Sequence, residues 1–105
     1  MNERAKMMDE VVVEVLRLTK SGWLRWRRTV DPECAETNLE GFMLSVRGVR
    51  VGSDVNVMLT MARNGVELGN VVNTAGAGEL WEMAQHEAFG VDEKLMDFLR
   101  IARSL

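Results

Sequence analysis

The spacing of apolar residues changes twice along this chain of 105 residues, and this restricts the fold more than any other feature. From residue 3 to about residue 20, apolar side chains recur every three or four positions, as on one face of an α-helix. From residue 23 to residue 72 they largely alternate with polar ones, as in strands with one buried face. After residue 79 the helical spacing returns. This order predicts an α+β fold with an N-terminal helix, an antiparallel meander of three to four strands, and one or two C-terminal helices packed on one face of the sheet.

Turn-forming residues set the expected boundaries of these elements. Ser21-Gly22 should end the first helix, because glycine readily adopts the left-handed conformation that follows helix C-termini. The expected strands cover residues 23–30, 42–51, 55–62 and 66–72, with a polar loop over residues 31–40. A helix over residues 79–89, closed by Gly90, and a last helix over residues 92–105 complete the chain.

Asn64-Gly65 is the strongest hairpin signal in the sequence. A two-residue loop at this dipeptide would place Met61 opposite Leu68 and Val57 opposite Val72 on the same face. Because that register agrees with the apolar pattern, we expect a fourth short strand after the loop.

Length and composition indicate one globular domain over residues 1–105, with 47% apolar and 28% charged residues. The apolar runs are too short for a membrane span, and the charged N-terminus lacks the apolar centre of a signal peptide. Cys34 is the single cysteine, which leaves no internal disulfide and favours a cytoplasmic setting. The net charge of −3 gives no large unopposed positive face of the kind that general nucleic-acid binders have.

The stretch GWLRWRRTV, residues 22–30, is the densest basic and aromatic segment of the chain. In a strand, Leu24 and Trp26 would point into the core and the odd-numbered side chains would point outward. Neighbouring strands would add more residues to that outer face. The expected binding surface, here called the Trp/Arg group, comprises Trp23, Arg25, Arg27, Met43, Arg47 and Met58.

Three interpretations of the Trp/Arg group stay open. It is an ordinary wet face whose arginines are solvated or paired with Asp31, Glu33 or Glu67. Alternatively it is a protein interface, because monomers seldom leave tryptophan and methionine clustered on an open sheet. Finally, it binds an anionic small ligand such as a nucleotide, or single-stranded nucleic acid, with arginine on phosphate and tryptophan stacked on a base.

The order helix, three strands, helix over roughly residues 3–90 resembles the topology of the double-stranded-RNA-binding domain. That resemblance implies a lysine cluster at the start of the second helix, where it contacts phosphates. The corresponding stretch here is Gly78-Glu79-Leu80-Trp81-Glu82, which is acidic. Carboxylates there would repel RNA, so no RNA-binding residue is carried over and double-stranded nucleic acid is not an expected partner.

Catalytic and metal-binding patterns are weak. Glu82 and His86 lie one helical turn apart, but the chain has one histidine and one cysteine, so a zinc site would need further carboxylates. The surroundings of Cys34 match no catalytic signature, and Ala75-Gly76-Ala77-Gly78 lacks the Gly-Lys-Ser/Thr ending of a phosphate loop. We therefore expect no enzyme, no metal and no cofactor.

Taken together, the residues favour a small non-enzymatic interaction protein. We expect a homodimer formed through the outer face or the edge of the sheet, or binding of another protein there, with the Trp/Arg group as the contact surface. A binder of an anionic ligand on the same surface is the alternative.

Overall fold

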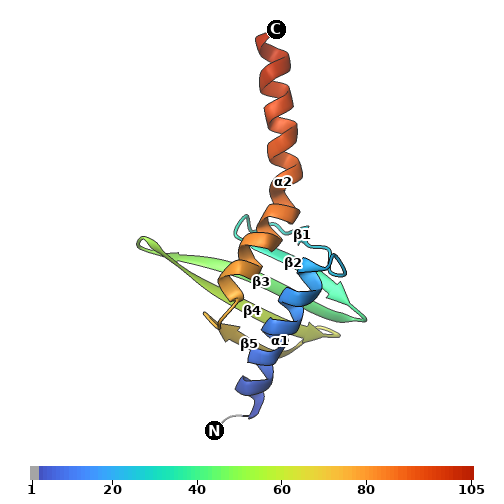
Figure 1. Ribbon diagram of the computed structural model, residues 1–105, viewed down its shortest axis with the longest axis vertical. Coiled ribbons are helices and arrows are strands. Elements are labelled where there is room, and N and C mark those ends of the chain that lie inside the picture. Colours follow the sequence, from blue (N-terminus) through green and yellow to red (C-terminus); the bar gives the residue numbers. More distant parts are fainter. Residues whose placement is uncertain (1–2) are drawn as a thin grey trace.

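A computed structural model describes residues 3–105 and has the predicted α+β architecture (Figure 1). The elements are α1 (Glu3–Lys20), β1 (Arg27–Arg28), β2 (Cys34–Leu39), β3 (Phe42–Val51), β4 (Asp54–Arg63), β5 (Val66–Val72) and α2 (Ala77–Ser104). The strands form one antiparallel sheet in the order β1-β2-β3-β4-β5, which is a meander with one strand more than the largest number expected. Both helices lie on the same face of this sheet (Figure 1).

Helix α1 forms and ends where the sequence predicts. Its buried residues Met8, Val12, Val15 and Thr19 follow the three- and four-residue spacing of one helical face. Gly22 then has a φ of 82°, and the N–H groups of Gly22 and Trp23 donate to the carbonyls of Thr19 and Leu18. These two hydrogen bonds form a Schellman motif, which turns the chain from the helix towards the sheet.

The region between residues 23 and 40 differs from the prediction. The expected strand over residues 23–30 is only two residues long, and the expected polar loop over residues 31–40 contains strand β2. The chain reverses because Asp31 Oδ1 accepts a hydrogen bond from the N–H of Glu33, and Thr29 Oγ1 accepts one from the N–H of Asp31. Strand β2 was missed because its buried residues, Cys34, Ala35 and Thr37, are small or polar and do not form an alternating apolar pattern.

The hairpin between β4 and β5 is confirmed, but the predicted register is wrong. Asn64 and Gly65 both have positive φ, 53° and 79°, as a type I′ turn requires. A bulge between Met61 and Ala62 then places Gly69, and not Leu68, opposite Met61. At Gly69 an added Cβ would lie 2.9 Å from Met8 Sδ, so the shifted register lets α1 pack closely on β5.

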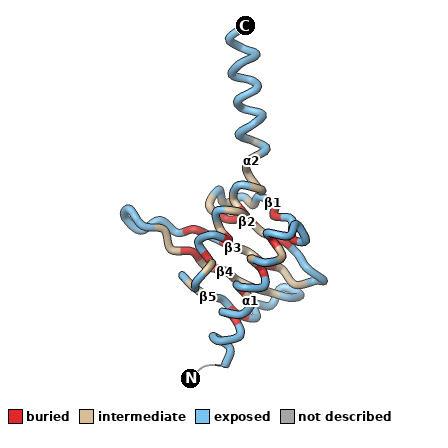
Figure 2. Tube along the Cα trace, viewed as in Figure 1, coloured by how far each residue is buried: buried red, intermediate tan, exposed pale blue. Residues whose placement is uncertain are grey.

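Helix α2 is one continuous helix of 28 residues, whereas the sequence predicted an interruption at Gly90. A glycine inside a helix costs only about 1 kcal/mol relative to alanine, so it does not have to end one. The first part packs on the sheet through buried Ala77, Leu80 and Ala84. The second part projects away from the domain, and Figure 2 shows it as exposed. Only the first part is therefore packed on the sheet as expected.

The core lies between the sheet and the two helices (Figure 2). Its largest fully buried side chains are Leu24, Leu59, Leu80, Val12, Val46 and Thr37. Within residues 3–105, no helix has both the length and the apolar character needed to cross a bilayer.

Candidate functional site

Trp23 and Arg25 lie outside the strands of the sheet. Trp23 lies in the turn after α1, and its side chain is 77% exposed. Arg25 precedes β1, and its Nε lies 3.3 Å from Glu87 Oε1 on α2. Its guanidinium therefore points to the helices, which cover the opposite face (Figure 1). These two residues therefore precede the sheet, whereas the other members of the Trp/Arg group are strand residues.

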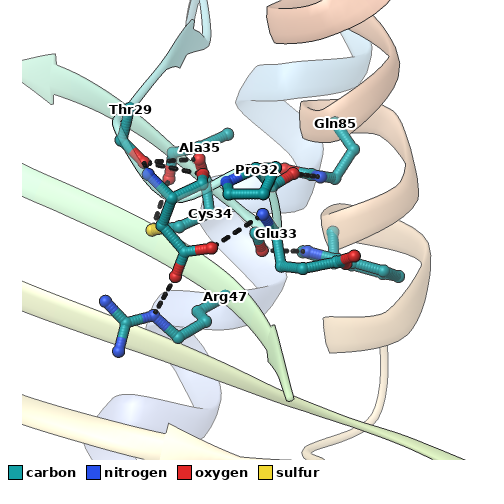
Figure 3. A network of polar contacts seen from close by, with 9 residues as sticks. Thr29, Pro32, Glu33, Cys34, Ala35, Arg47 and Gln85 are labelled. Atoms are coloured by element: carbon teal, nitrogen blue, oxygen red, sulfur yellow. Dashed lines mark hydrogen bonds and ion pairs between the residues drawn. The ribbon is translucent and has the colours of Figure 1, made fainter. Parts of the chain in front are cut away.

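Arg27 and Arg47 do lie on the outer face, and each is paired with a carboxylate. Arg27 is opposite Glu36 in the sheet, with 3.9 Å between Nη2 and Glu36 Oε1. Arg47 Nε lies 3.2 Å from Asp31 Oδ2, as Figure 3 shows. An anionic ligand would compete with these carboxylates for either arginine.

The two methionines of the Trp/Arg group are on the outer face as predicted. Met58 is opposite Arg47 in the sheet, and Met43 is opposite Asn38. Both methionines are half-buried, and the Asn38 side-chain amide lies 3.0 Å from Met43 Sδ. The outer face therefore brings together Met43, Arg47 and Met58, with Arg27 on the edge strand.

Two side chains of α2 donate hydrogen bonds to backbone carbonyls of the turn before β2 (Figure 3). Trp81 Nε1 donates to the carbonyl of Glu33 at 2.9 Å, and Gln85 Nε2 donates to that of Pro32 at 2.7 Å. The N–H of Gly48 donates to the same Glu33 carbonyl. This network joins the turn before β2 to both α2 and β3.

The two groups considered for catalysis lie on different elements. Cys34 is buried and lies at the start of β2, whereas His86 is exposed on α2. Within residues 3–105, no group of three or more histidine, cysteine, aspartate or glutamate side chains is placed to hold a metal ion.

Glu87 is the acceptor that connects the segment before β1 to α2. Its Oε1 accepts a 2.6 Å hydrogen bond from the N–H of Trp26, in addition to its ion pair with Arg25. Replacing Glu87 with alanine leaves this partly buried N–H without its acceptor, so we expect a loss of about 1–2 kcal/mol in the free energy of unfolding. Urea denaturation measures this loss. Glu82→Ala, which removes an exposed carboxylate from the same helix, should change stability by less than about 0.5 kcal/mol.

The surface that the sequence prediction missed is the C-terminal part of α2. Six large apolar residues there are exposed, namely Val91, Leu95, Met96, Phe98, Leu99 and Ile101, and so is Leu105 directly after the helix. The apolar stripe of this segment was visible in the sequence, but it was assigned to packing on the sheet. The signal that could have found this surface is length, because a helix of 28 residues extends about 42 Å, more than one small domain can cover.

No protein-family model, no curated protein and no solved structure matches this chain.

Proposed function

We propose that this chain is a non-enzymatic interaction protein that works as a homodimer, and that its contact surface is the projecting half of α2, residues 91–104, together with Leu105 directly after it. The observation that carries the proposal is the exposure of this half. Every described side chain from residue 91 onward is exposed, although half of the segment is apolar. Monomeric domains seldom expose such a continuous apolar surface, which is typical of an interface.

The sequence of this half favours contact with protein. Val91, Leu95, Phe98, Ala102 and Leu105 are separated by four, three, four and three residues, the spacing of a helix that packs along one seam. The charged residues Glu93, Asp97 and Arg100 fall on the other side of the helix, whereas Lys94 and Arg103 lie at the borders of the apolar stripe. A second copy of this chain is the simplest partner, because homodimers with two-fold symmetry are the commonest oligomers.

The outer sheet face supports self-association less well. Its arginines are already paired with Glu36 and Asp31, and Trp23 and Arg25 lie elsewhere. The same ion pairs weigh against an anionic ligand or single-stranded nucleic acid on that face. For these reasons we assign the contact surface to α2.

Sedimentation velocity tests the homodimer. The wild-type chain should increase in mass with concentration, from the 11.8 kDa of one chain towards twice that mass. The double substitution Leu95→Asp and Phe98→Asp, here called the helix variant, places charge on two side chains that are 58% and 66% exposed. It should fold normally and raise the dissociation constant by about a hundredfold or more, since each large apolar side chain contributes about 1.5–3 kcal/mol on burial.

The matched control is Val13→Asp, which changes a 59% exposed apolar residue on α1. This variant should associate like the wild type. A wild-type chain that stays at one-chain mass at all concentrations, or a helix variant that associates normally, would contradict the proposal.

A further inference from the structure

A second apolar surface without a covering element lies beside α1. It is an open groove of about 420 Å³ between α1 and the sheet. Its apolar lining consists mainly of Met7, Val11 and Leu18 from α1 and of Leu39, Phe42 and Met61 from the strands. The lining residues come from α1 and from β2, β3 and β4. Helix α1 lies on the face of the sheet that carries both helices (Figure 1). A groove of this kind accepts the apolar side of an amphipathic helix.

The apolar stripe on the projecting half of α2 is wider than a two-helix seam requires. Leu99 and Ile101 lie on either side of the seam formed by Leu95 and Phe98, and both are exposed. A helix in a two-stranded coil buries a narrow stripe, whereas a helix that packs on a domain buries a broader one. The width therefore favours a groove over a single partner helix.

The charges of the two surfaces are complementary. Glu10 and Glu14 of α1 also line the groove, and the end of α2 carries Arg100 and Arg103. Glu14 is paired with Arg17 and Arg100 with Asp97, but both are exposed pairs within one helix and contribute little. An α2 end that runs antiparallel to α1 brings Arg103, which lies next to Leu99 at the border of the apolar stripe, to the acidic wall. This orientation also opposes the two helix dipoles.

From these three observations we infer that the projecting half of α2 of each copy docks in the α1 groove of the other copy. This inference rests on the proposed homodimer and names the surface that receives the helix. The exchange is reciprocal. In the dimer, the projecting halves of both copies and the grooves of both copies are therefore buried. It predicts that each copy contributes a helix and a groove that mutations can inactivate separately.

Mixing of two defective chains tests the exchange. The groove variant combines Met7→Asp, at a 56% exposed position in the groove, with Glu14→Arg on its acidic wall. Because both positions are exposed, it should fold normally, as circular dichroism can verify. Alone, it should have a dissociation constant raised at least about tenfold, as measured by sedimentation. Val13→Asp, on the same helix but outside the groove, should associate like the wild type.

The mixture of the groove variant and the helix variant decides the geometry. The groove variant keeps an intact α2 and the helix variant keeps an intact groove, so the two should form a heterodimer through one contact, which native mass spectrometry detects. A groove variant that dimerises like the wild type, or a mixture without heterodimer, would contradict docking in the α1 groove. Either result would leave α2 as the contact surface. A helix variant that still dimerises would overturn the proposed function itself.

Discussion

Replacement of Trp26 with alanine is expected to lower the free energy of unfolding by about 3–5 kcal/mol, the usual loss for a buried tryptophan. Only 3% of this residue is exposed. Its Nε1 donates to Thr19 Oγ1 on α1, and its backbone N–H donates to Glu87 on α2. The side chain therefore fills the space where both helices meet the sheet edge, and alanine leaves a cavity there.

Trp23→Ala is the matched comparison, because it removes the same side chain three positions earlier from a site that is 77% exposed. It should change stability by no more than about 0.5 kcal/mol. Thermal or urea denaturation of the two variants gives the difference. Equal losses in both would show that the burial of these two indoles has been assigned wrongly.

The second large effect is expected at Gly48, which lies against the indole of Trp81. A Cβ at position 48 would lie 2.6 Å from Trp81 Cε2, closer than side-chain atoms pack. Gly48→Val would displace the indole and break its hydrogen bond to the carbonyl of Glu33. We expect a loss of about 3 kcal/mol or more, since overpacking and the lost hydrogen bond act together.

Gly78→Ala is the control for Gly48, because a Cβ at position 78 would contact nothing within 4 Å. Alanine favours the helical conformation, so this variant should be as stable as the wild type or more stable by up to about 1 kcal/mol. Denaturant titration compares the two. A Gly48→Val protein as stable as the Gly78→Ala protein would refute the close contact with Trp81.

The sequence predicts an element wherever local chemistry alone determines it. The apolar spacing of α1, the glycine after it and the Asn64-Gly65 turn each act within a few residues, and the structure contains all three. Strand β2 depends on tertiary contacts instead. Thr37, for example, is buried, and its hydroxyl is satisfied by donating to the carbonyl of Arg25, 12 residues earlier. No local pattern reveals such a contact.

The candidate site was only partly predictable for a similar reason. Alternation correctly places Met43, Arg47 and Met58 on the outer face, because β3 and β4 are long regular strands. It fails for Arg25, whose backbone is not in a strand and whose side chain meets Glu87 from a distant helix. The projecting half of α2 was predicted as a helix with an apolar stripe, but sequence periodicity does not tell which surface covers that stripe.

Amide hydrogen exchange along α2 tests most directly whether its projecting half is an interface. A helical segment of this length without tertiary contacts is only marginally stable in water, so its amides exchange quickly when it is solvated. Amides of residues 91–104 should therefore exchange slowly at protein concentrations where the dimer forms and much faster after dilution to the monomer, while those of residues 80–88 remain protected in both. Exchange over residues 91–104 that does not change with concentration would contradict self-association through α2.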